Sequence, residues 1–106
     1  MLVVTTETIG SKRIVKSLGL VRGNTVRARN VGKDITAGLR ALVGGEISEY
    51  VKLMAEAREQ SVDRMIEAAE HLGANAVVAT RFTTSMVMSG AAELLATGTA
   101  VIVEDD

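Results

Sequence analysis

The residues best suited to bind a metal ion lie near the end of one charged, helix-forming segment. Asp63, Glu67 and His71 follow one another at intervals of four, a spacing that places them on one face of an α-helix. Carboxylate and imidazole groups bind divalent metal ions, so such an ion is a candidate cofactor. Soft heavy metals prefer thiolates, and the sequence contains no cysteine and a single histidine. A solvated acidic helix face, with His71 near the helix C-terminus, is the better supported interpretation because zinc sites normally need three or four ligands.

A second group of residues could form a polar pocket around Arg58. Arg58 falls on the apolar stripe of the same predicted helix, where an unpaired buried charge would be costly. Its expected neighbours at the junction with the preceding helix are Asn30, Asp34, Arg40, Glu46 and Tyr50. As a ligand site, the group would recognise an anionic or amphipathic small molecule. As structure, it would be an ion-pair network that locks the helices and a subunit interface, and we favour this interpretation because buried polar groups more often fix geometry.

Catalysis has little support from the residue pattern. No His or Lys is placed so as to activate a Ser, Thr or Tyr hydroxyl group. Gly44-Gly45 follows a predicted helix instead of a strand, which argues against a phosphate-binding loop, and Gly98 within a predicted strand favours close packing or a bulge. We therefore expect no enzyme activity. The competing hypothesis is an enzyme whose active site assembles between subunits around Asp34, Arg40, Tyr50 and Arg58.

Two helices are expected to position these residues. Asp34 can N-cap a short helix that ends at Gly44-Gly45. The following segment, Glu46–Leu72, predicts a long helix, since its apolar residues recur at spacings of three and four. Gly73 would cap this helix in the left-handed conformation. A second stripe on the same segment is acidic and consists of Glu56, Glu59, Asp63, Glu67 and Glu70.

The remaining segments predict β-strands. Leu2–Thr5 is a short apolar strand, and Ala76–Met88 with Leu94–Glu104 predicts an antiparallel hairpin rich in Val, Thr and Ala. Residues 14–21 and 25–31 predict two further strands or one long bent strand, with a turn at Arg22-Gly23-Asn24. The expected fold class is α+β, a mainly antiparallel sheet packed on one long and one short helix and assembling into a ring.

Composition limits the classes of protein to which the chain can belong. Its 106 residues predict one domain, 1–106, with only two aromatic side chains to fill the core. The first third is basic, but it has no stacking aromatics and no nucleic-acid motif, so we interpret its charges as facing the acidic helix of the same or a neighbouring chain. Neither a signal peptide nor an apolar run of 18 residues is evident, which favours a cytoplasmic protein without a membrane partner.

Several blocks in a fixed order resemble one family of small bacterial and archaeal proteins. The blocks are Val3-Val4-Thr5-Thr6, Leu18-Gly19-Leu20-Val21, the run from Asp34 to Gly45, Tyr50, Glu56-Ala57-Arg58, Gly73-Ala74-Asn75-Ala76-Val77 and Gly98-Thr99-Ala100-Val101. They cover essentially the whole chain and resemble the YbjQ-like family. The resemblance implies a dodecin-like fold, a ring-shaped homopentamer and a heavy-metal-binding label. Flavin binding, by analogy with dodecins, has less support because the chain has no Trp for stacking.

The expected protein is a non-enzymatic homopentamer that binds a metal ion or a small ligand. The number five comes from the resemblance, whereas the need for partners follows from the residues. A long apolar helix stripe and a hairpin rich in Val and Thr present more apolar surface and strand edge than one aromatic-poor domain readily covers. Cyclic closure would cover these surfaces in every copy.

Overall fold

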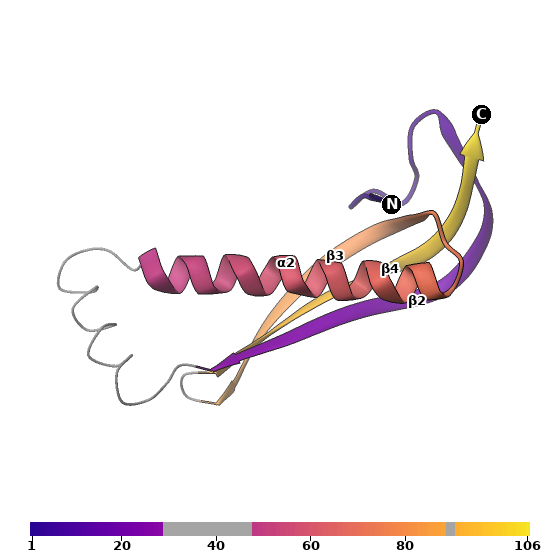
Figure 1. Cartoon of the computed structure of the whole chain (residues 1–106). Coiled ribbons are helices and arrows are strands. Elements are labelled where there is room, and N and C mark those ends of the chain that lie inside the picture. Colours follow the sequence, from indigo (N-terminus) through magenta and orange to yellow (C-terminus); the bar gives the residue numbers. More distant parts are fainter. Residues whose placement is uncertain (29–47, 89–90) are drawn as a thin grey trace.

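The computed structural model describes the backbone of residues 1–28, 48–88 and 91–106. Its elements are strands β1 (Leu2–Val3) and β2 (Lys12–Ala28), helix α2 (Ser48–His71), and strands β3 (Ala76–Met88) and β4 (Ala91–Asp105). Figure 1 shows α2 running along one face of the curved sheet. The expected α+β class is confirmed in this form, one helix on a four-stranded mixed sheet. The predicted short helix that starts at Asp34 lies outside the described residues, and so do Asn30, Arg40 and Glu46.

The strands form one sheet in the order β1-β3-β4-β2. β4 is central among the long strands and pairs antiparallel with β2 on one side and with β3 on the other. The predicted antiparallel hairpin is therefore confirmed. The short β1 adds a parallel pairing to β3 at Ala76 and Val77, which makes the sheet mixed. β2 is an edge strand, and its 17 residues run the full length of the sheet.

The predicted turn at Arg22-Gly23-Asn24 is wrong, because β2 continues through these residues in register with β4. Gly23 lies directly beneath α2 instead. A Cβ atom at this position would collide with the Ser61 carbonyl oxygen and the Met65 amide nitrogen, and would lie 2.8 Å from the Arg64 Cβ. The absence of a side chain at Gly23 thus lets α2 lie close to β2, and the residue does not form a turn.

The long helix and its C-terminal cap agree with the sequence-based expectation. α2 covers Ser48–His71, within two residues of the predicted bounds at each end. Gly73 has φ +84°, its amide donates to the Glu70 carbonyl at 2.9 Å, and the Ala74 amide donates to the Ala69 carbonyl at 3.1 Å. These two bonds constitute a Schellman motif, which satisfies carbonyl groups of the last helical turn and directs the chain into β3.

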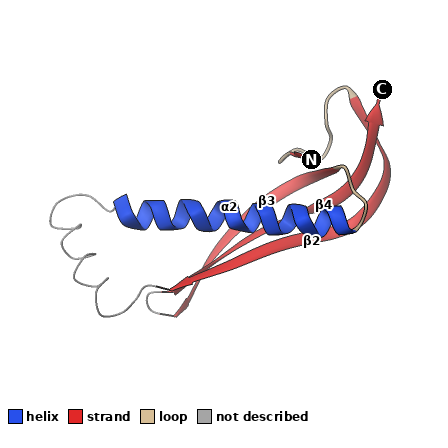
Figure 2. Ribbon diagram, viewed as in Figure 1, coloured by secondary structure: helices blue, strands red, loops and turns tan. Residues whose placement is uncertain are grey.

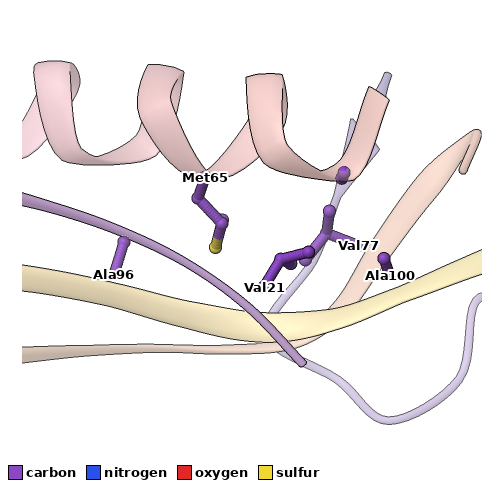
Figure 3. Packing of buried hydrophobic residues seen from close by; sticks show 6 residues of the cluster. Val21, Met65, Val77, Ala96 and Ala100 are labelled. Atoms are coloured by element: carbon purple, nitrogen blue, oxygen red, sulfur yellow. The ribbon is translucent and has the colours of Figure 1, made fainter. Parts of the chain in front are cut away.

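The core between α2 and the sheet is built mainly from small side chains. It is formed by Val21, Met65, Ala69, Val77, Ala96 and Ala100, and Figure 3 shows Met65 pointing from the helix toward the strands. Because alanine side chains are small, each buries little apolar area, but they let the helix lie close to the sheet. This close approach stabilises the core through many van der Waals contacts. This core is located beneath the C-terminal half of α2.

In the described part of the chain, the opposite face of the sheet is covered only near one end. There, Val4 and Ile9 of the N-terminal segment pack on a second cluster formed by Ala76, Val78 and Val101, with Val103 beside them. Figure 2 shows this loop at the end of the sheet where both chain termini lie, away from the N-terminal end of α2. Among the described residues, no helix is long and apolar enough to span a membrane.

Candidate functional site

The three predicted metal ligands lie on α2 with exposed side chains. Asp63, Glu67 and His71 occupy successive turns of the helix. A rise of about 1.5 Å per residue separates Glu67 from His71 by about 6 Å along the axis, but Asp63 from His71 by about 12 Å. One ion can therefore bridge two neighbouring members, but not all three. Within the described segments, no three His, Cys, Asp or Glu side chains are grouped so that they could hold a metal ion.

Arg58 differs from its predicted environment, because its side chain is exposed in the single chain. The buried face of α2 runs instead through Ala57, Ser61, Met65 and Ala69. Because α2 lies so close to β2 at Gly23, only the helix face with small side chains can pack against the sheet. Arg58 does not lie on this face. Of the residues predicted to surround Arg58, the structure describes only the backbone of Tyr50.

A buried polar network joins α2 to the sheet and was not anticipated from the sequence. The hydroxyl oxygens of Thr25 and Ser61 lie 2.9 Å apart, and both residues are almost fully buried. Thr25 also lies 3.0 Å from the Ala57 carbonyl, and Ser61 lies within 3.1 Å of the Ala57 and Leu94 carbonyls. Both hydroxyl groups therefore have hydrogen-bond partners within the protein, and we interpret the network as fixing the register of α2 on the strands. The spacing of Ala57 and Ser61, small residues one turn apart, was the signal for this contact in the sequence.

The basic strand and the acidic helix do not neutralise one another within the described part of the chain. The ion pairs that are present join β2 to β4, with Lys12 to Asp105 at 2.7 Å and Arg13 to Glu104 at 3.0 Å. The hydrogen bond from Lys12, followed by its charge, lowers the pKa of Asp105. Between β2 and α2 the contacts are polar but not ionic: Arg27 donates to the Gln60 side chain at 2.7 Å, and Arg64 donates to the Asn24 carbonyl at 2.5 Å. The exposed acidic stripe of α2 is thus left open to a partner.

Apolar side chains are exposed on both outer long strands. On β2 the most exposed are Leu20 and Val26, with Ile14 and Val15 also exposed, and on β3 they are Phe82, Met86 and Val87. Phe82 and Met86 pair across the sheet with Ala96 and Ala92, which places them on the face that carries α2. They remain exposed because the helix packs mainly over β2 and β4. These surfaces, together with the acidic stripe, are the candidate interaction sites of the single chain.

Comparison with known proteins gives matches over nearly the full length. A family model described as "Putative heavy-metal-binding" matches residues 1–104. A UPF0145 protein of Methanosarcina acetivorans is 58% identical over 101 residues, covering 95% of each chain. A UPF0145 protein of Clostridioides difficile is 57% identical over 106 residues, covering 100% of this chain and 95% of the relative. A crystal structure from Pediococcus pentosaceus, a protein of unknown function in the DUF74 family, superposes with a TM-score of 0.62 over 98% of both chains at 14% identity, a similarity that concerns the fold alone.

Proposed function

Since the chain belongs to the YbjQ family, whose model is described as "Putative heavy-metal-binding", we propose that it acts as a homopentameric module that binds a divalent metal ion at sites completed between subunits. The observation that carries the metal-binding part is the pair Glu67 and His71. These side chains are exposed and adjacent on one helix face, where a carboxylate and an imidazole can share an ion. The pair would supply two ligands from each subunit.

Two ligands are too few for a tight site. Zinc sites in proteins normally use three or four protein ligands, supported by further hydrogen bonds. Asp63 lies too far along the helix axis to complete the set in the same chain, and thiolates are absent from the sequence. The missing ligands would therefore come from a neighbouring copy. Such a site depends on assembly and favours borderline ions such as Zn²⁺ over soft ones.

The shape of the single chain supports assembly. Its radius of gyration is 17.4 Å, against about 13 Å expected for a compact domain of this length. Within the described residues, α2 covers part of one sheet face, and the N-terminal segment covers one end of the other. A ring of identical copies would cover the remaining apolar surface of each subunit equally, and the family resemblance supplies the number five.

Calorimetric titration of the assembled protein with Zn²⁺ tests the metal-binding proposal. We expect binding in the micromolar range or weaker, which is lost in His71→Ala and in Glu67→Gln. Glu59→Gln is the matched control, because Glu59 belongs to the same acidic stripe but lies two turns before Glu67. Binding should be retained in this control. The absence of Zn²⁺ binding up to millimolar concentration, or a site that survives His71→Ala, would contradict the proposal.

A further inference from the structure

Among the residues that the structure describes, the sheet has two open edges. β2 is the outermost strand on one side, and within these residues it pairs with β4 alone. On the other side, β1 and the N-terminal segment pair with β3 only as far as Thr80, whose amide donates to the Val4 carbonyl at 3.1 Å. In the described part of the chain, β3 has no partner at this edge from Arg81 to Met88. Long open edges present unpaired amide and carbonyl groups that readily accept another strand.

Both edges also present exposed apolar side chains. On β2, Leu20 is 70% exposed and Val26 is 56% exposed; on β3, Met86 is 74% exposed and Phe82 is 49% exposed. Edge strands that remain unpaired usually carry charges or bulges that discourage pairing. From Phe82 to Val87, β3 carries no charged residue, and from Arg81 to Met86 it pairs with β4 without a register shift, so neither a charge nor a bulge protects this part of its edge. The edge of β3 is therefore suited to pairing with another strand.

The two flanks of α2 differ in charge. Gln60 and Arg64 contact β2, so this flank, which also carries Glu56 and Asp63, faces the β2 side of the molecule. Residues two positions away on a helix point to nearly the opposite side, since each residue turns by about 100°. Arg58 and Val62 therefore lie on the flank above β3, where the apolar strip of Phe82 and Met86 is uncovered.

We infer that the free edge of β2 in one copy pairs with the free edge of β3 in the next copy. This inference rests on the proposed homo-oligomer and identifies its interface. β2 and β3 both run antiparallel to β4 and are thus parallel to each other. A rotation that places β3 of the next copy beside β2 keeps this direction, so the intersubunit pairing is parallel. Because the two edges are different surfaces, the contact runs head to tail, and the rotation between copies in the proposed homopentamer closes it into a ring.

The pairing also accounts for the charges and the apolar strip. It places the acidic flank of one α2 beside the Arg58 flank of the next, with Phe82 and Met86 of that copy between the two helices. Three strands are about 14 Å wide at about 4.8 Å each, compared with about 10 Å for a helix. Neighbouring helices are therefore close enough for long side chains such as Arg58 and Glu56 to meet. The same contact covers Phe82 and Met86, whereas Leu20 and Val26 of β2 lie on the sheet face opposite α2.

Cysteine cross-linking tests this pairing, since the natural chain has no cysteine to interfere. Asn24→Cys or Val26→Cys in β2 would be combined with Thr83→Cys or Ser85→Cys in β3, four exposed positions on the sheet face opposite α2. We expect oxidation, or a short bis-maleimide, to give at least one double variant a covalent ladder that extends to the ring number in denaturing electrophoresis. Each single variant should remain monomeric under the same denaturing conditions.

Three outcomes distinguish a failure of the β2–β3 edge pairing from a failure of the proposed homo-oligomer. Covalent dimers from a single variant would show that like edges pair with like edges, which overturns the inference. The lack of a ladder in all four double variants, while light scattering still reports a ring, would overturn the edge pairing but leave the homo-oligomer intact. A monomer by light scattering would overturn both.

Discussion

Replacement of Gly23 by alanine should be among the most destabilising single-methyl changes available in this protein. The new Cβ would collide with the Ser61 carbonyl oxygen and the Met65 amide nitrogen. These atoms belong to the backbone of α2, so no side-chain rotation can relieve the contact and the whole helix must move away from β2. The movement would also lengthen the contacts between Ser61 and Thr25, which are 2.9 Å apart in the native structure.

The size of the effect follows from the cost of overpacking, about 1–3 kcal/mol when atoms are forced into a well-packed core. A rigid backbone partner places Gly23→Ala in the upper part of this range, at about 2–3 kcal/mol. For a domain of about 100 residues this corresponds to a fall in Tm of roughly 10 °C. The positive-φ penalty that complicates many glycine substitutions does not apply, because φ at Gly23 lies outside that region.

Thermal and urea unfolding monitored by circular dichroism would measure the loss. Parent and variant must be compared at equal chain concentration, because assembly couples Tm to concentration. Gly10→Ala is the matched control, since a Cβ at Gly10 would meet no atom within 4 Å. It should change the free energy of unfolding by less than about 0.5 kcal/mol. If Gly23→Ala were as mild as Gly10→Ala, the close approach between helix and strand described above would be refuted.

Three further predictions follow from individual contacts. Ser61→Ala should cost about 1–2 kcal/mol in urea unfolding because it removes a buried hydroxyl that lies within hydrogen-bond distance of the Ala57 and Leu94 carbonyls. The exposed Ser17→Ala should be neutral, and equal midpoints for the two variants would contradict this prediction. Gly73→Ala should cost about 1 kcal/mol, since Ala is disfavoured at φ +84°, and an unchanged denaturation midpoint would show that the cap is dispensable. The Asp105 carboxyl should titrate below its ordinary pKa by NMR and move upward in Lys12→Met. Because the folded-state pKa of Asp105 is depressed, its small contribution to stability is present above the unfolded-state pKa and is lost as the pH falls through the folded-state value.

The sequence was sufficient to predict the long helix, its cap and the hairpin but not all the contacts between them, and the predicted short helix at Asp34 lies outside the described residues. The periodicity of Glu46–Leu72, the cap at Gly73 and the β3–β4 hairpin each depend on local chemistry, and each is confirmed. Gly98 was expected to permit close packing, and a Cβ there would lie 2.5 Å from the Val77 Cγ1. Gly23 was misinterpreted as part of a turn, since a glycine beside an asparagine is typical of turns and only the tertiary contact shows its role.

The candidate site was harder to predict for the same reason. Hydrophobicity alone places Arg58 at the centre of the apolar stripe, whereas packing selects the neighbouring face with Ala57 and Ser61. On the other flank, Val51 is then left exposed and Val62 packs only partly against the core. A search for small residues at helical spacing, opposite glycine and alanine on a strand, would have located the buried face. The candidate metal ligands lie on successive turns of one helix, as their spacing predicted, but spacing along one helix cannot bring three ligands to one ion.

The measurement that tests the central claim most directly is the mass of the purified protein in solution by light scattering coupled to size-exclusion chromatography. The account predicts a single species of about five times the 11.2 kDa chain mass, maintained on dilution to low micromolar concentration. The mass should remain the same after treatment with a chelator, since the open strand edges, and not the metal ion, hold the ring together. A stable, monodisperse species of 11.2 kDa would contradict both the assembly and the binding sites proposed between its subunits.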